Sequence, residues 1–201
     1  MSNAEVLQLI VFTLGWAGGR VPVYVDGELA TTIGHTGELV NDADSLLRRA
    51  VRWDFERNAE VALGLPPARE GTTVLWAWVA GKDQLRRARR FSPLPSIALR
   101  VGGSSRRLLL WGLNERVDRH LAEHSNRKLA YALHARQKDA DGDALRVPLP
   151  GTFLRIGRKK PAPILVTRAI FSCVSRERVV GRLKDPPAPF MQRLREGRVS
   201  R

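Results

Sequence analysis

The segment from Phe91 to Leu113 reads "FSPLPSIALRVGGSSRRLLLWGL" and decides the fold. It opens on a proline-rich turn and continues into a short apolar run, "IALRV", which is typical of a buried strand. The next residues, "GGSSRR", are rich in turn formers and lead into a second apolar run, "LLLWGL". The pattern predicts two consecutive core strands that are joined by a basic turn.

A further strand is predicted just before this segment. The stretch "VLWAWVAGKDQ", Val74 to Gln84, combines branched and aromatic residues and then stops at "GKD", as a buried strand does when it enters a turn. Trp76 and Trp78 alternate with smaller residues, so they either fill a buried strand or stack on bases. The residues "KDQLRRARRF" that follow are predicted to form a short helix with four arginines.

The remaining chain supplies strands and helices in mixed order and shows no internal repeat. One domain of helices and strands is predicted over residues 1–185, followed by a basic tail over 186–201 that begins within "DPPAP", residues 185–189. The apolar stretch 5–19 is expected to be the first core element. Strands are predicted at 21–30, as a hairpin around Asp26-Gly27, at 59–65 and on both sides of the basic turn "RIGRKKP", and helices are predicted at 42–57 and 115–135.

The charge balance is strongly basic. The 201 residues include 34 Lys and Arg against 20 Asp and Glu, which gives a net charge of +14. A hydrophobic content of 43% excludes a disordered chain and fits a domain with a real core. A coding bias toward Arg would explain Arg in place of Lys, but it would not explain the shortage of acids. Because such a surface attracts polyanions, nucleic acid is the predicted partner.

No metal site or membrane segment is predicted from the pattern of residues. Cys173 is the single cysteine, which excludes a disulfide framework and a cysteine-based zinc site. His120 and His124 have helical spacing, but "HLAEH" lacks the glutamate of a zinc-protease motif, so they are interpreted as surface residues. The apolar stretch 5–19 is too short to span a membrane and has no basic region before it, so a cytoplasmic location is predicted.

Four sequence features follow one another in a fixed order between residues 58 and 168. They are Pro95-Ser96 at the start of a strand, Trp111 in the next strand, "NRKLA" at 126–130, and "PGT" at 150–152 after an acidic loop. Together they resemble the archaeo-eukaryotic primase superfamily, and above all the bifunctional primase-polymerase domains of phages and plasmids. The resemblance implies a single α+β domain with a central mixed or antiparallel sheet, flanked by helices and built on an RRM-like core.

The chain departs from this family pattern at the positions of the catalytic residues. Family members place two carboxylates at a strand end, where they hold two magnesium ions for nucleotide transfer. Here the matching positions hold Trp78 and Ala80, and the family's motif histidine matches Leu108, or Arg107 after a one-residue slip. The resemblance therefore implies a primase fold whose catalytic acids have been replaced, with no metal and no catalytic residue.

Ten cations near predicted strand ends and turns are expected to contact phosphates without reading base sequence. The turn "GGSSRR" is either an ordinary connection or a phosphate-binding turn, and "RIGRKKP" is either a solvated hairpin tip or the main phosphate site. The ten are Arg86, Arg87, Arg89, Arg90, Arg106, Arg107, Arg155, Arg158, Lys159 and Lys160.

Three functions remain open at this point. The first is a catalytically degenerate primase-like protein that binds DNA or RNA during replication of a phage, plasmid or mobile element, alone or as a subunit of a larger assembly. The second is an active primase-polymerase that uses Mg²⁺ or Mn²⁺ and acids relocated to Asp83, Asp141 and Asp143. The third is an interaction protein whose basic surface binds an acidic protein.

Overall fold

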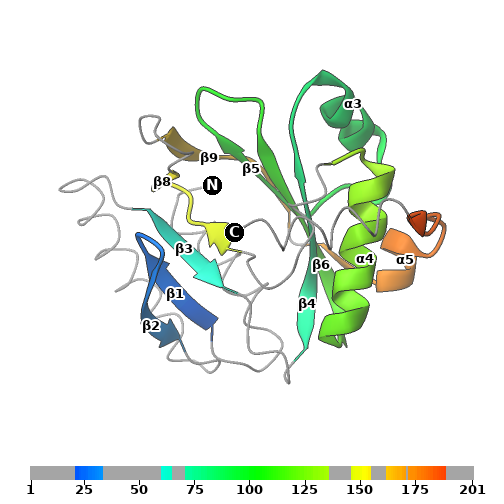
Figure 1. Cartoon of the computed structure of the whole chain (residues 1–201), viewed down its shortest axis with the longest axis horizontal. Coiled ribbons are helices and arrows are strands. Elements are labelled where there is room, and N and C mark those ends of the chain that lie inside the picture. Colours follow the sequence, from blue (N-terminus) through cyan, green and yellow to red (C-terminus); the bar gives the residue numbers. More distant parts are fainter. Residues whose placement is uncertain are drawn as a thin grey trace.

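The computed structural model describes residues 21–33, 60–64, 71–135, 146–154, 162–170 and 172–188. These residues form two β-sheets that face each other, with helices on the outer side of one sheet (Figure 1). The predicted helix at 42–57, the first core element at 5–19, the basic turn at 155–161 and most of the tail lie outside the described residues.

The first sheet has the strand order β2-β1-β3-β7, and all its neighbours are antiparallel. The predicted hairpin is confirmed, because β1 and β2 are joined by Asp26 and Gly27, whose φ angles are +49° and +90°. An Asp-Gly pair adopts such positive φ angles at low cost, which fixes the turn. The strands are β1 (Val21–Val25), β2 (Glu28–Ile33), β3 (Val61–Gly64) and β7 (Arg146–Pro148).

The second sheet contains the segment that decides the fold. Its order is β4-β6-β5-β9-β8, and the short strand β10 runs parallel to β6 where β6 extends beyond β5. The sheet is antiparallel apart from this one parallel pair, which confirms the predicted mixed or antiparallel sheet. The strands are β4 (Thr72–Val79), β5 (Ile97–Val101), β6 (Arg107–Val117), β8 (Phe153–Leu154), β9 (Ala162–Ala169) and β10 (Cys173–Val174).

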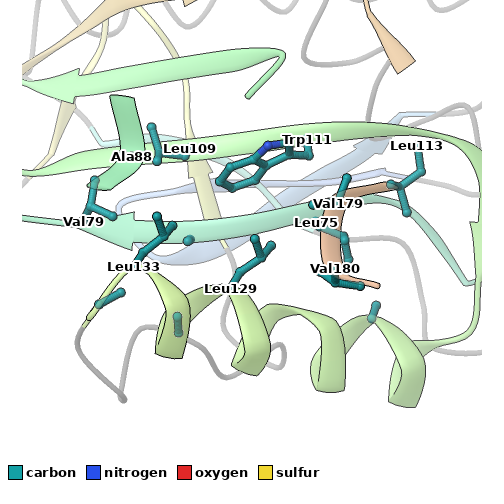
Figure 2. Packing of buried hydrophobic residues seen from close by; sticks show 14 of the residues in the cluster. Leu75, Val79, Ala88, Leu109, Trp111, Leu113, Leu129, Leu133, Val179 and Val180 are labelled. Atoms are coloured by element: carbon teal, nitrogen blue, oxygen red, sulfur yellow. The ribbon is translucent and has the colours of Figure 1, made fainter. Parts of the chain in front are cut away.

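Two hydrophobic cores lie on opposite faces of the second sheet. The inter-sheet core joins it to the first sheet and includes Val74 and Trp76 of β4. The helix-side core takes the alternate residues of β4, among them Leu75 and Val79, and packs them with Trp111 against the helices (Figure 2). The helices are α3 (Lys82–Arg90), α4 (Arg119–Ala132) and α5 (Arg176–Val180).

The helix predicted from residue 115 begins four residues later than expected. The residues up to Val117 continue strand β6, so the helical reading of that stretch was wrong. Asp118 stops the strand and caps the helix, because its carboxylate accepts a hydrogen bond from the amide of Leu121 at 2.8 Å. Val117 is the one apolar residue of 115–118, so the sequence has no periodicity there to distinguish strand from helix, and the capping aspartate decides where the helix starts.

The residues that carried the family resemblance hold the fold together. The hydroxyl of Ser96 donates to the Ser172 carbonyl at 2.6 Å and accepts from the Gly112 amide at 3.0 Å. The indole of Trp111 donates to the Pro93 carbonyl at 2.8 Å. The hydroxyl of buried Thr152 donates to the Leu149 carbonyl at 2.8 Å and so closes its turn. These bonds are buried or partly buried, so they constrain the backbone whatever chemistry the domain performs.

Asn126 makes the most consequential of these bonds. Within the described residues β4 pairs with β6 alone, so half of the β4 amides point away from the sheet. The fully buried Asn126 side chain reaches from α4 and accepts a hydrogen bond from the Trp76 amide at 2.9 Å. This bond ties the helix to the edge of the sheet and satisfies an amide that water cannot reach.

We expect Asn126→Ala to lower the free energy of unfolding by about 1–3 kcal/mol, because it leaves the buried Trp76 amide without an acceptor. Urea denaturation followed by circular dichroism measures this loss. His120→Ala, an exposed change on the same helix, is the control and should have little effect. Equal losses for the two variants would show that the amide bond does not stabilise the fold.

Candidate nucleic-acid interface

The end of β4 is the place where the resemblance puts the catalytic side chains. Trp78 and Leu108 are Cα partners in the antiparallel pairing of β4 with β6, so their side chains lie on the same face of the sheet. Leu108 is fully buried in the inter-sheet core, and Trp78 is partly buried against it. Two positions matched from sequence alone, thirty residues apart, are therefore neighbours in space. The third, Ala80, follows the last residue of β4 and is partly buried.

Arg106 lies over the ring of Trp78. Its guanidinium carbon is 4.3 Å from the ring centroid, which is the geometry of a cation–π contact. Trp78 thus packs against the inter-sheet core and also carries a cation on its ring, which favours core packing over base stacking. A base that stacked on the same face would have to displace Arg106.

Asp83 is held by arginines rather than placed toward the inter-sheet core. It lies exposed in the first turn of α3, where its carboxylate accepts hydrogen bonds from Arg86 at 2.7 Å and from Arg87 at 3.0 Å. Arg87 and then Arg86 hold the pKa of Asp83 below its ordinary value. Among the described residues, no three side chains of the His, Cys, Asp and Glu types come together as a metal site.

The short basic helix predicted after β4 is confirmed as α3. Ala88 is its one buried residue, and it packs in the helix-side core. The other residues of α3 are exposed or half-buried, so its arginines face solvent. The four predicted phosphate-binding residues on this helix are Arg86, Arg87, Arg89 and Arg90.

Three backbone amides of the turn between β5 and β6 already have acceptors within the protein, at the turn itself or in β9. The Gly102 amide donates to the Pro163 carbonyl at 2.7 Å, and the Ser104 amide donates to the Val101 carbonyl at 3.2 Å. The Arg106 amide donates to the Ser104 hydroxyl at 3.1 Å. Phosphate contact at this turn would therefore fall on arginine side chains rather than on these three amides.

Arg100 is a cation that the sequence reasoning missed. It is the Cα partner of Arg107 across β5 and β6, while Arg107 also pairs with Val79 at the end of β4. Because Val79 packs in the helix-side core, both arginines lie on that face of the sheet. Their Nε atoms are buried and have no partner among the described atoms. A hairpin register drawn through "GGSS" would have brought the two arginines together from sequence.

The other predicted site residues lie outside the described part of the chain. They are Asp141 and Asp143 ahead of the Pro-Gly-Thr turn, and Arg155, Arg158, Lys159 and Lys160 between β8 and β9. Their roles stay predictions. In the described ranges, no helix is long and apolar enough to cross a membrane.

Comparison with known proteins gives matches in structure but none in sequence. No protein-family model matches the chain, and no curated protein matches it. The crystal structure of primase RepB' superposes with a TM-score of 0.63 at 13% identity over 98% of the chain, which spans 64% of that protein. The catalytic domain of RepB' in complex with initiator DNA gives 0.63 at 12% identity, over 99% of this chain and 98% of that domain.

A third match comes from a phage. The archaeo-eukaryotic primase-type domain of the cyanophage S-2L primase-polymerase superposes with a TM-score of 0.56 at 16% identity, over 90% of this chain and 97% of that domain. All three structures belong to primases or primase-polymerases, which agrees with the resemblance drawn from the sequence motifs. The chain therefore has the fold of archaeo-eukaryotic primase and primase-polymerase domains.

Proposed function

We propose that the chain is a primase-fold protein that binds nucleic acid through phosphate contacts and has no metal centre for nucleotide transfer. One observation carries this proposal. The resemblance gives the positions of Trp78 and Leu108 to catalytic side chains. In the structure these two residues are paired neighbours on β4 and β6, where Leu108 is buried in the inter-sheet core and Trp78 packs against it.

The side chains at this place do not fit a magnesium site. Magnesium is held by oxygen ligands in octahedral geometry, and primase chemistry needs carboxylates that bridge two such ions. An indole, an isobutyl group and the methyl group of Ala80 offer no oxygen. Arg106 above Trp78 adds a positive charge, which repels a metal ion further. These three positions therefore supply no ligands for the metal ions of nucleotide transfer.

Binding to nucleic acid is supported by where the cations lie. The end of β4, the start of β6 and the end of β5 meet at one end of the second sheet, because Arg107 pairs with both Val79 and Arg100. Helix α3 begins at that same end, two residues after Ala80. Exposed and half-buried arginines from three elements therefore gather there, on a chain whose net charge is +14.

The setting is proposed from the neighbours. RepB' and the S-2L protein are a primase and a phage primase-polymerase, and one RepB' structure contains initiator DNA. We infer that this chain acts in the cytoplasm during replication of a phage, plasmid or mobile element, alone or as a subunit beside a catalytic partner. Phosphate contacts dominate this interaction, so DNA and RNA are both within reach of the same surface.

Fluorescence anisotropy with labelled DNA and RNA oligonucleotides tests the proposal. Binding is expected in EDTA as well as in Mg²⁺, because no metal bridges the protein to the phosphates. A pull-down from lysate, with and without nuclease, separates the competing function. Partners that persist after nuclease treatment, together with no oligonucleotide binding, would identify an interaction protein for acidic partners instead.

A further inference from the structure

An open pocket of about 370 Å³ lies between α3 and the end of α4. Its position is on the helix side of the second sheet, because Ala88 of α3 and Leu133 after α4 both pack in the helix-side core (Figure 2). The place of the missing metal centre is on the other face, where Trp78 meets the inter-sheet core. The pocket is lined by Arg86, Arg87, Arg90, Phe91, Ala132 and Leu133.

The pocket combines an apolar floor with a cationic rim. Phe91 packs edge-on against Trp111, with ring centroids 5.5 Å apart and an interplanar angle of 68°. Leu133 is fully buried beneath it, so the partly buried Phe91 ring is the accessible floor of the pocket and is held by the core. The three arginines are exposed at the rim and can reach a ligand that rests on this floor.

The charge at the rim is positive after its internal ion pairs are counted. Asp83 pairs with Arg86 and Arg87 and orients both side chains, but a single carboxylate balances a single guanidinium. Arg90 has no ion-pair partner among the described residues. An anion with several oxygens, such as a phosphodiester, would complete the pairing through bidentate bonds to guanidinium groups.

We propose that this pocket binds one nucleotide unit of a single-stranded nucleic acid. The base or sugar rests on Phe91, and the flanking phosphates contact the arginines of the rim. Proteins that bind single strands use this combination of a basic groove and an aromatic or apolar platform. A duplex keeps its bases stacked and paired, so it cannot reach the floor. The inference rests on the proposed function and adds a base or sugar contact to the α3 part of that surface, on the face opposite the missing metal centre.

If these arginines only stabilised the end of α3, Arg90 would contribute no more to binding than an arginine in the last turn of another helix. Arg87, Arg89 and Arg90 lie in the last turn of α3, where cations stabilise the exposed carbonyls of the helix end. Arg178 lies in the last turn of α5, is exposed and does not line the pocket. Arg178 therefore provides a control with the same charge at a corresponding helix position, outside the predicted phosphate-binding residues.

The first test compares Arg90→Gln with Arg178→Gln in the full chain. Anisotropy with a labelled oligo-dT is expected to show about a tenfold loss of affinity for Arg90→Gln and less than about a twofold loss for Arg178→Gln. The slope of log affinity against log salt should fall by about 1 for Arg90→Gln alone. Equal effects of the two variants would overturn the pocket assignment.

The second test fills the pocket without changing its charge. Ala132→Leu keeps a good helix former in α4 and places a larger side chain over the floor. Oligo-dT binding should weaken about tenfold while duplex binding and the melting temperature stay unchanged. Wild-type affinity for oligo-dT in this variant would overturn the proposal. A drop in melting temperature would shift the decision to Arg90→Gln, which leaves the floor intact.

Competition distinguishes a strand from a free nucleotide, which offers the same chemistry. Unlabelled oligo-dT should displace the probe, whereas dTTP and inorganic phosphate should not do so at matched phosphate concentration. Displacement by dTTP alone would assign the pocket to free nucleotides and overturn the assignment to a strand. If the unmodified chain binds no oligonucleotide, the proposed function itself fails. If it binds and all pocket variants bind equally well, the pocket inference fails alone.

Discussion

Purified protein that is given a template, nucleotides and Mg²⁺ or Mn²⁺ is expected to make no primer. The positions that the resemblance assigns to metal ligands hold Trp78 and Ala80. Leu108 occupies the position that matches the family's motif histidine. A metal clamp contributes several kcal/mol to transition-state stabilisation, and about 5 kcal/mol corresponds to roughly four powers of ten in rate. Gel analysis of labelled products over long incubations measures this, with an active primase as the positive control.

Metal-dependent primer synthesis would contradict this expectation. Robust metal-dependent synthesis would mean that acids elsewhere have rebuilt the centre, and Asp83, Asp141 and Asp143 are the candidates. Each would then be tested by substitution with alanine. Loss of synthesis in Asp141→Ala or Asp143→Ala, with oligonucleotide binding retained, would identify the chain as an active primase-polymerase and refute the degenerate reading.

Affinity for oligonucleotides is expected to fall steeply with salt, because binding releases counterions from the phosphates rather than reading bases. If about six cations contact phosphates, affinity should drop by roughly a thousandfold between 50 and 200 mM salt. Anisotropy titrations at a series of salt concentrations give the slope directly. An affinity that is flat over this range, or absent at low salt, would contradict the proposed function.

A matched pair of variants tests whether the salt dependence of binding comes from a defined part of the surface. Arg107→Gln removes a charge at the end of the second sheet, and the slope is expected to fall by about 1. Arg178→Gln removes the same charge from α5 and should leave the slope unchanged. Equal changes in both variants would show that only the total charge matters and that no defined interface exists.

The fold could be predicted from sequence because the recognisable residues are the ones that build it. Ser96, Trp111, Asn126 and Thr152 are buried, and each makes a hydrogen bond that fixes a strand, a helix or a turn. Buried bonds of this kind are costly to lose, so the residues that make them are informative about the fold. Local patterns also identified the hairpin at Asp26 and the basic helix α3.

Features that depend on contacts between segments far apart in the chain could not be predicted from the sequence. The first sheet joins β1 to β3 and β3 to β7, strands separated by long stretches of chain, and no local pattern specifies that partnership. The helix-side pocket combines Arg90 with Ala132, which come from different helices, so its existence follows only from how α3 meets the end of α4. Net charge predicted a basic surface but could not say which arginines share a face.

Manganese binding tests the central claim most directly, because it depends on no template, primer or partner. Electron paramagnetic resonance of free Mn²⁺ during titration of the full chain counts bound ions. We predict no saturable submillimolar site, since Trp78 and Leu108 offer no oxygen ligand at the end of β4. A stoichiometric Mn²⁺ site that disappears in Asp83→Ala, Asp141→Ala or Asp143→Ala would contradict the account and restore a metal centre to this primase fold.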